Sequence, residues 1–310
     1  MHFTVGVIGL GLIGGSMALD LKRRGFANKV LGVENDSVAA QAAQTIGLVD
    51  EVVSYEDCVA RADIVVVAVP VGTAVKMVPD ILDRFAAGGH APSGAFARTG
   101  SQSDAEEGVC PSVAKEQIVI DVCSTKEQIC NATKYHPLRK QFVSTHPMAG
   151  TEYSGPWAAQ PGLFDGRACI FANAEESAPK AVKVIEELYG VLNMRPIYMN
   201  AASHDVHTAY VSHISHVTSF ALALTVLDKE KDEKHIFDLA SGGFSSTVRL
   251  AKSNADMWVP ILTQNHDNVL HVMDTYIEKM QQFREAVANY DEARIRELIQ
   301  EANRIKKIIR

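Results

Sequence analysis

The feature that most constrains the fold is a glycine-rich stretch near the start of the chain, at residues 5–16. An apolar run enters it, three glycines follow with G-x-G-x-x-G spacing, and a helical pattern leaves it. Gly9 permits the tight turn from strand to helix, Gly11 lets a pyrophosphate approach the backbone, and Gly14 lets the helix pack closely on the strand. The unpaired N–H groups at the helix N-terminus favour the anion. The stretch predicts a dinucleotide-binding unit of strand, turn and helix.

A carboxylate at the end of the next strand indicates which dinucleotide is bound. The apolar run 29–33 ends in Glu34, twenty residues after Gly14. A carboxylate there accepts hydrogen bonds from both ribose hydroxyls of NAD and repels the 2′-phosphate of NADP, so we expect NAD to be preferred. The alternative is a glycine-rich turn in an α/β fold that binds no nucleotide. The predicted cofactor site comprises Gly9, Gly11, Leu12, Ile13, Gly14, Glu34, Val69 and Pro70.

Composition and charge limit the class of protein. At 310 residues the chain can form two domains, and a hydrophobic content of 47% is ordinary for a globular protein. A formal net charge of −7 without a basic stripe argues against nucleic acid as a partner. We find no run of about 18 apolar residues to span a membrane, and no room for a signal peptide before the first strand. Five scattered cysteines without a C-x-x-C pair indicate neither disulfides nor a zinc site, so we expect a cytoplasmic protein.

The order of apolar and helical patterns predicts two domains. Strand and helix signals alternate up to residue 199, and Pro70 ends one buried strand at the edge where open α/β sheets bind ligands. Within residues 200–310, helical periodicity extends over 201–227, 256–289 and 291–310, and the apolar run 220–227 predicts helix packing within or between subunits. We therefore expect an α/β fold, with a Rossmann-type dinucleotide-binding domain (1–199) followed by an all-helical domain.

A long stretch rich in Gly, Ser, Ala and Pro interrupts the first domain at residues 86–113. It has few large apolar side chains, so it cannot bury enough surface to offset the entropy lost on ordering. A loop of this length is uncommon inside a compact domain. We interpret it as a surface insertion, either flexible or folded over a site.

His146 is the candidate for acid–base chemistry. It follows an apolar run and precedes Pro147, which forbids helix continuation, so we place it at the carboxyl edge of the predicted sheet. The glycine-rich turn and Ser124 are expected at the same edge. Histidine can take up a proton near neutral pH, and we expect the pKa of His146 near the ordinary histidine value. The alternative is a histidine that caps a turn through a ring nitrogen.

Several histidines open the helical half, and they admit more than one role. His213 and His216 share one helical face through their i,i+3 spacing. No H-E-x-x-H pattern occurs, and no cysteine or carboxylate on the same turn completes a tetrahedral set, so we expect no metal. Substrate contact is the role we expect, with core or capping positions as the alternative. The histidines in this part of the sequence are His204, His207, His213 and His216.

Arg249 is a candidate for binding a carboxylate. It follows the glycine pair Gly242-Gly243 by a few residues, so we expect it just after a flexible turn. The planar guanidinium can bind a carboxylate with two parallel hydrogen bonds. The alternative is an ordinary exposed arginine on the surface.

Five motifs in the same order make the chain resemble the prephenate dehydrogenase family of tyrosine biosynthesis, which includes arogenate and cyclohexadienyl dehydrogenases. The resemblance covers nearly the whole chain and both predicted domains. The motifs are the glycine-rich residues 9–16, Asp-Val-Cys-Ser-Thr-Lys at 121–126, His-Pro-Met-Ala-Gly-Thr-Glu at 146–152, Ser-His-Ile-Ser-His at 212–216, and the stretch 243–249 followed by Met257-Trp258.

This resemblance implies a fold, a reaction and residue roles. The fold is an NAD(P)-binding Rossmann domain followed by a helical domain that forms a homodimer, and the reaction is oxidative decarboxylation of prephenate to 4-hydroxyphenylpyruvate. His146 would accept a hydrogen bond from the ring hydroxyl as hydride leaves, and Ser124 would position that hydroxyl and the histidine. His216 and Arg249 would hold the substrate carboxylates. The other substrate-site residues implied are His213, Thr151 and Gly243.

Two departures from the family pattern keep alternatives open. The insertion at 86–113 is longer than the turn usual there. Ser246 stands where some members carry an acidic residue, which leaves arogenate as an alternative substrate. A β-hydroxyacid dehydrogenase or imine reductase shares the domain plan, but it would need a lysine in the linking helix and would leave His146 without a role. A nucleotide-sensing module without turnover is a third alternative, against which His146 and Arg249 argue.

Overall fold

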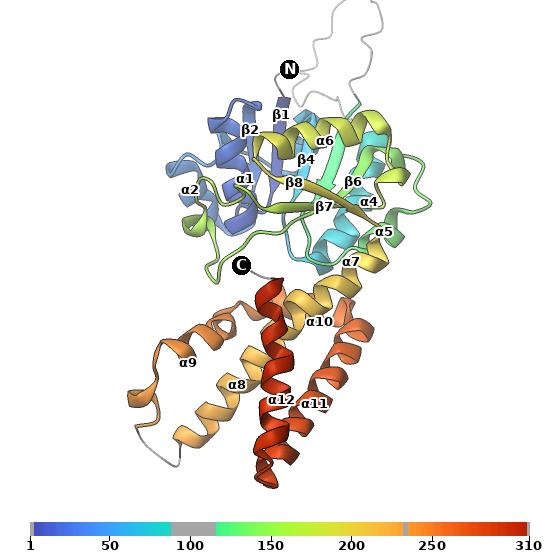
Figure 1. The fold of residues 1–310 in the computed structure, drawn as a ribbon. Helices are drawn as coiled ribbons and strands as arrows, with labels where there is room; N and C mark the ends of the chain where they lie inside the picture. Colours follow the sequence, from blue (N-terminus) through green and yellow to red (C-terminus); the bar gives the residue numbers. More distant parts are fainter. Residues whose placement is uncertain (1–2, 88–115, 232–234, 309–310) are drawn as a thin grey trace, which may run out of the picture.

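The structure is a computed structural model that describes residues 3–87, 116–231 and 235–308. Figure 1 shows a sheet flanked by helices in the first part of the chain and a group of helices extending away from it in the second. The last strand, β8 (Arg195–Met199), is followed at once by the first helix of the second part, α7 (Ala201–Thr208). The predicted order of an α/β domain and an all-helical domain is confirmed.

One eight-stranded sheet forms the first part, in the order β3-β2-β1-β4-β5-β6-β7-β8. β6 and β7 pair antiparallel, and the other neighbouring pairs are parallel. Because β1 lies between β2 and β4, the strand order reverses beside it, and open α/β sheets bind ligands at such a point. The strands are β1 (Phe3–Ile8), β2 (Ala27–Val33), β3 (Glu51–Val52), β4 (Ile64–Val67), β5 (Ile118–Asp121), β6 (Phe142–Pro147), β7 (Ala168–Ala172) and β8.

Helices cover both faces of the sheet, which explains why its central strands are apolar throughout. On β4, Ile64 and Val66 pack in the core beneath α1 and α6, whereas Val65 and Val67 pack in the core beneath α3 and α4. All four are fully buried, as a strand covered on both faces requires. The helices of this domain are α1 (Leu12–Arg23), α2 (Ser37–Thr45), α3 (Tyr55–Arg61), α4 (Val71–Ala86), α5 (Glu127–Thr133) and α6 (Pro179–Val191), with short 3₁₀ turns at Arg139–Gln141, Pro156–Ala158 and Ala174–Glu176.

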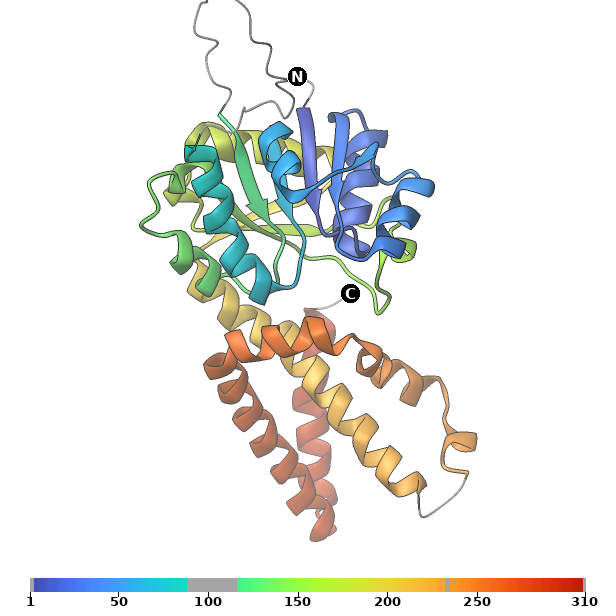
Figure 2. The same cartoon turned by 180° about the vertical axis from the view of Figure 1, so that it is seen from behind.

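The second part begins with a nearly continuous helical run. α7 passes through a π-helical turn (Ala209–His213) into α8 (Ile214–Glu230), and Figures 1 and 2 agree that α8, α11 and α12 extend away from the sheet. π-turns often occur at functional sites. The remaining helices are α9 (Gly242–Thr247), α10 (Ala255–Gln264), α11 (His266–Ala288) and α12 (Glu292–Ala302), with 3₁₀ turns at Phe237–Leu239, Arg249–Lys252 and Asn303–Lys307.

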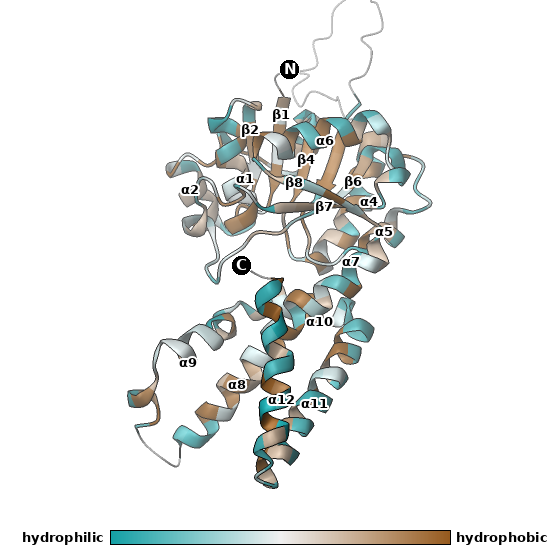
Figure 3. Cartoon of the chain, viewed as in Figure 1, coloured by the Kyte–Doolittle hydropathy of each residue, from teal (hydrophilic) through white to brown (hydrophobic). Residues whose placement is uncertain are grey.

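The helical part leaves much apolar surface uncovered in the single chain. Figure 3 shows hydrophobic segments along α8, where Leu224 is 61% exposed. By length and composition alone, the run Ala201–Glu230 could cross a membrane. Its first turns, however, carry His204, Asp205 and His213, whose polar side chains are buried against the rest of the protein. An exposed apolar surface of this kind suits a second subunit. The absence of a membrane partner stays a prediction.

The insertion predicted at 86–113 falls almost wholly outside the described residues. Ala86 is the last residue of α4, and Ala87 caps that helix. Our interpretation of residues 88–113 therefore stays a prediction.

Candidate active site

The glycine-rich turn between β1 and α1 has the shape of a phosphate cradle. Gly9 has φ +93°, and a Cβ on it would lie 2.5 Å from the carbonyl oxygen of Ala68. A Cβ on Gly14 would lie 2.0 Å from the carbonyl oxygen of Gly9, so only glycine lets α1 approach the turn. A Cβ on Gly11 would meet no atom within 4 Å, which leaves open space where a pyrophosphate would approach. The three glycines thus have three different environments.

Glu34 reaches this turn from the end of β2. Its Oε2 accepts a hydrogen bond of 3.0 Å from the backbone N–H of Leu10, and its Oε1 accepts from the N–H groups of Asn35 and Asp36. The carboxylate is therefore fixed beside the start of α1, near Gly11, where the adenosine ribose of a dinucleotide lies in this fold. Val69 and Pro70 lie just beyond β4, on the other side of β1. These residues fit NAD, which would supply the hydride acceptor.

His146 lies at the carboxyl end of β6, where Pro147 is the last strand residue. Its Nδ1 is 2.8 Å from Nε2 of His204, on α7, and Nδ1 of His204 is 2.7 Å from Oδ1 of Asp205. Ser124 follows β5, the neighbouring strand, so its hydroxyl lies at the same edge. Within the described residues no hydrogen bond joins Ser124 to His146. The partner that holds His146 is therefore His204.

An aromatic cluster continues from this group into the helical domain. Asn265 donates from Nδ2 to the carbonyl oxygen of Asp205 at 2.7 Å and contacts Nδ1 of His213 at 3.2 Å. The ring of Trp258 contacts His213 edge-on and stacks on His216 with centroids 3.5 Å apart. The indole Nε1 of Trp258 is buried without a partner among the described residues. The expected substrate contacts His213 and His216 thus share one wall.

Arg249 lies in the 3₁₀ turn Arg249–Lys252, and its side chain is half exposed. Burial lowers the pKa of His216, and the charge of Arg249 lowers it further. Nη1 of Arg249 donates to Oε2 of Glu152 at 3.1 Å. Thr151, next to Glu152, accepts a hydrogen bond at Oγ1 from the N–H of Tyr153. The flexible turn predicted before Arg249 is wrong, because Gly243 lies in the first turn of α9, after Ser241 as N-cap. A short helix holds Arg249 more firmly than a loop would.

Comparison with known proteins assigns nearly the whole chain to one family. The nucleotide-binding domain of prephenate dehydrogenase matches residues 17–85 and 103–198, and its dimerisation domain matches residues 200–301. The chain belongs to the prephenate dehydrogenase family. This membership confirms the resemblance deduced from the five motifs.

Individual members of the family support the same assignment. Prephenate dehydrogenase of Bacillus subtilis (strain 168) is 29% identical over 94% of this chain and 72% of its own. Cyclohexadienyl dehydrogenase of Zymomonas mobilis is 27% identical over 93% of this chain and 89% of its own. The crystal structure of prephenate dehydrogenase from A. aeolicus, in complex with hydroxyphenyl propionate and NAD+, superimposes with a TM-score of 0.79 at 25% identity and covers 100% of this chain and 99% of that one.

Two histidines of this prephenate dehydrogenase site, His146 and His213, are held neutral. Burial lowers the pKa of His146 well below its ordinary value, and the neighbouring His204 and the Lys126 ammonium lower it further. Burial likewise lowers the pKa of His213 to about 4. The expected pKa of His146 near the ordinary histidine value is therefore wrong. A neutral imidazole is the form that can accept a hydrogen bond from a hydroxyl.

A buried ion pair beneath His146 was not predicted from the sequence. Lys126 and Asp121 have no solvent exposure, and the Nζ of Lys126 donates to Asp121 and, at 2.7 Å, to the carbonyl oxygen of Thr145. Asp121 also accepts from the hydroxyl of Ser144 at 2.8 Å. Burial alone would lower the pKa of Lys126, but the Asp121 carboxylate outweighs it and raises the pKa above its ordinary value. The pair fixes the strand that carries His146.

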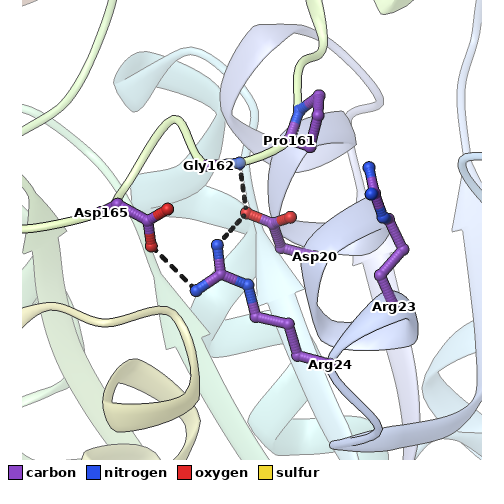
Figure 4. Close-up of a pocket in the computed structure, with 6 residues that line it drawn as sticks. All are labelled: Asp20, Arg23, Arg24, Pro161, Gly162 and Asp165. Atoms are coloured by element: carbon purple, nitrogen blue, oxygen red, sulfur yellow. Dashed lines mark hydrogen bonds and ion pairs between the residues drawn. The ribbon is translucent and has the colours of Figure 1, made fainter.

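A surface pocket of about 410 Å³ lies apart from this site, at the end of α1 (Figure 4). Asp20 accepts from the N–H of Gly162 at 2.9 Å and from Nη2 of Arg24 at 3.3 Å. Nη1 of Arg24 donates to Asp165 at 2.9 Å. Asp20, Arg24 and Asp165 pair with one another, and the hydrogen bond from Gly162 to Asp20 fastens that segment to α1. The residues around it are Asp20, Arg23, Arg24, Pro161, Gly162 and Asp165.

The contrasting surroundings of two glycines predict different effects of alanine. Gly14→Ala forces a backbone contact, so we expect a loss of about 1–3 kcal/mol in stability or more. Gly11→Ala meets open space, so its melting temperature should stay near wild type, whereas NAD should bind at least about tenfold more weakly. Thermal unfolding and NAD titration measure both effects. If Gly11→Ala bound NAD normally, the open space at Gly11 would not be the phosphate site.

Proposed function

We propose that this chain catalyses the NAD-dependent oxidative decarboxylation of prephenate to 4-hydroxyphenylpyruvate in tyrosine biosynthesis. The observation that supports this most is the state of His146. Its Nδ1 is occupied by His204, and within the described residues its Nε2 has no hydrogen-bond partner. A neutral imidazole nitrogen is thus available at the sheet edge that also carries the glycine-rich turn.

The proposed reaction asks little acid–base strength of the protein. A hydride moves from the ring carbon that bears the hydroxyl to NAD, the bond from the ring to its carboxylate breaks, and that electron pair enters the ring. One CO2 and one reduced cofactor form for each prephenate consumed, and the product keeps the phenolic proton. His146 therefore needs only to share the hydroxyl proton while hydride leaves. Because the ring becomes aromatic, alignment is the main contribution that the site must make.

The far wall of the site suits the substrate's two carboxylates. Arg249 uses one terminal nitrogen on Glu152, so its guanidinium retains donors for a second carboxylate. His216 stacks on the indole ring of Trp258, and its Nδ1 donates to the carbonyl oxygen of Ser212 at 3.1 Å. We propose that Arg249 binds one carboxylate and that His216, protonated when the substrate is bound, binds the other through Nε2, with His213, Thr151 and Gly243 lining the same mouth.

Steady-state rates with prephenate and with arogenate, each in the presence of NAD, test the proposal. We expect the absorbance of reduced nicotinamide to rise with prephenate. Arogenate is the second candidate, because a cyclohexadienyl dehydrogenase is among the relatives. Ser246 offers no carboxylate to the ammonium group of arogenate, so we expect prephenate to have the higher kcat/KM. The absence of turnover with both substrates would contradict the proposal. The β-hydroxyacid dehydrogenase alternative is disfavoured, since the one lysine of the helical run Ala201–Glu230 is Lys229, in its last turn at the end away from His204.

Glu34 predicts a strong preference for NAD over NADP. Its carboxylate is fixed by three backbone N–H groups, so it cannot swing away from a 2′-phosphate. We expect kcat/KM to favour NAD by on the order of a hundredfold, and Glu34→Gln to narrow that ratio. The matched comparison is Asp36→Asn, which should leave the ratio unchanged if Glu34 alone faces the ribose. Equal use of the two cofactors by the wild type would show that Glu34 does not face the ribose.

We also propose that the chain is a homodimer built on the helical domain. The apolar run 220–227 lies on α8, where Leu224 and Leu227 are exposed in the single chain. An isologous interface there would cover them. Sedimentation equilibrium at micromolar concentration should give twice the mass of one chain, and Leu224→Arg should shift the protein to monomer. Tyr135→Arg, on the nucleotide-binding domain, is the control and should remain dimeric. A wild-type monomer would contradict the proposal.

A cytoplasmic location is a further proposal. Four of the cysteines are buried as free thiols: Cys58, Cys123, Cys130 and Cys169. Burial raises the pKa of Cys130 to about 11, so that thiol is unreactive at neutral pH. Buried free thiols of this kind suit a reducing compartment.

A further inference from the structure

Asp205 is a buried acid whose hydrogen bonds reach His146 through His204, and it connects the two domains. It lies on α7 and is 2% exposed. Its Oδ1 accepts from the N–H of Lys126 at 2.8 Å, and its Oδ2 accepts from the N–H of Glu127 at 2.9 Å. Its Oδ1 is also 2.7 Å from Nδ1 of His204. An ionised carboxylate has no proton to donate, so Asp205 accepts from both backbone N–H groups and from His204.

The acceptor at Asp205 determines where the protons on the two histidines lie. A carboxylate that only accepts requires a proton on Nδ1 of His204. In a neutral imidazole the other nitrogen, Nε2, then carries a lone pair. That Nε2 is 2.8 Å from Nδ1 of His146, so the proton between the two rings belongs to His146. Nε2 of His146 is left with its lone pair.

We propose that His204 and Asp205 are positioning residues that fix His146 in the tautomer with a bare Nε2, and thereby make it the acceptor for the substrate hydroxyl. This inference depends on the proposed function for the identity of that hydroxyl. His204 acts through His146, and Asp205 acts through His204. When His146 takes up part of the hydroxyl proton, the hydrogen bonds through His204 also connect the resulting positive charge to the buried Asp205 carboxylate.

The same contacts would arise if Asp205 only fastened α7 to the nucleotide-binding domain. A fastening role depends on the backbone N–H groups of Lys126 and Glu127, and not on which nitrogen of His146 carries the proton. The two roles therefore differ in their effect on the tautomer and on kcat.

The first measurement is the tautomer itself, from ¹⁵N NMR of histidine-labelled wild-type protein without substrate at neutral pH. We expect His146 with Nδ1 protonated and Nε2 bare, because chemical shifts distinguish the two nitrogens. A proton on Nε2 would overturn the proposal, whatever the activity of the protein. The predicted tautomer in a protein that turns over neither prephenate nor arogenate would contradict the proposed function while supporting this inference.

Substitutions then separate positioning from fastening. An amide at position 205 has one acceptor where the carboxylate has two. With its NH2 group on the His204 side, it donates to that ring and reverses both protons, which leaves His146 without a lone pair at Nε2. Asp205→Asn should therefore lower kcat on the order of a hundredfold to ten-thousandfold with little change in KM. His204→Gln keeps an oxygen that can accept from Nδ1 of His146, whereas His204→Leu does not. We expect the glutamine variant to retain at least about tenfold more kcat than the leucine variant.

The double variant Asp205→Asn with His204→Gln provides the decisive comparison. Glutamine at position 204 cannot transmit a change of tautomer from residue 205 to His146. The fold-loss in kcat that Asp205→Asn causes should therefore be at least about tenfold smaller in the His204→Gln protein than in the wild type. An equal Asp205→Asn effect in both backgrounds would overturn the proposal and indicate fastening alone. If Asp205→Asn fails to fold, the comparison of His204→Gln with His204→Leu tests the proposal instead. Equal kcat values for these two variants would overturn the positioning role.

Discussion

Replacing His146 with asparagine should lower kcat by on the order of a hundredfold to ten-thousandfold while KM stays nearly unchanged. Asparagine keeps a polar side chain that can donate to His204, but it has no basic nitrogen to share the hydroxyl proton as hydride leaves. The hydrogen bond between His146 and the hydroxyl strengthens in the transition state, so its removal lowers kcat. Steady-state kinetics with saturating NAD measure both constants.

The pH dependence of the wild-type rate checks the same residue. Burial holds the pKa of His146 well below the ordinary histidine value, so the base is already neutral at about pH 6.5. We expect kcat/KM to stay level through the neutral range and to fall only at more acidic pH, where His146 gains a proton. The sequence pattern predicts substrate contact for His207, but the structure leaves it exposed, with Nδ1 on the carbonyl oxygen of Ser203 in its own helix. His207→Asn should therefore keep the wild-type rate and profile. A His146→Asn enzyme with normal kcat would exclude His146 as the base.

Lys126→Met should destabilise the protein by about 3–5 kcal/mol, because it leaves the fully buried Asp121 carboxylate without its cation. The methionine fills most of the lysine volume, so the loss reports the charge more than a cavity. Urea unfolding at one fixed protein concentration measures it, since dimerisation would make the midpoint depend on concentration.

Two further variants identify the cause of that loss. Adding Asp121→Asn to Lys126→Met removes the unpaired charge and should recover part of the stability. Lys180→Met changes an exposed lysine, 84% accessible at its side chain, and should alter stability by less than about 0.5 kcal/mol. If Lys126→Met were as mild as Lys180→Met, the buried pair would not stabilise the strand that carries His146.

The architecture could be predicted from local patterns in the sequence. The G-x-G-x-x-G spacing and the continuous apolar run of β4 each reflect interactions within a short stretch of chain, and Glu34 binds Leu10, 24 residues away in the same strand–helix–strand unit. The helical half was predicted in the same way, from its periodicity. Family motifs then connected these local features to one activity.

The partners of the candidate site could not be predicted in this way, because they lie far apart along the chain. His146 and His204 are 58 residues apart, and Arg249 and Glu152 are 97 residues apart. Nothing in a single sequence distinguishes Asp205 from an exposed acid on a helix. Only the packing of α7 against the start of α5 brings it to two backbone N–H groups.

The pKa of His146 was mispredicted for the same reason. Residue type alone sets the ordinary value, whereas burial beside His204 and Lys126 sets the value in the folded protein. The prediction of a flexible turn before Arg249 was wrong for a more local reason. Glycine pairs are typical of turns, but Gly242 and Gly243 form the first turn of α9 after the N-cap Ser241.

The most direct test of the proposed reaction uses prephenate labelled with deuterium at the ring carbon that carries the hydroxyl. With NAD and the purified protein, we predict that the label moves to the reduced nicotinamide, that equal amounts of CO2 and 4-hydroxyphenylpyruvate form, and that His146→Asn slows all three together. Label retained in the organic product, or CO2 released without reduced nicotinamide, would contradict hydride transfer coupled to decarboxylation at this site.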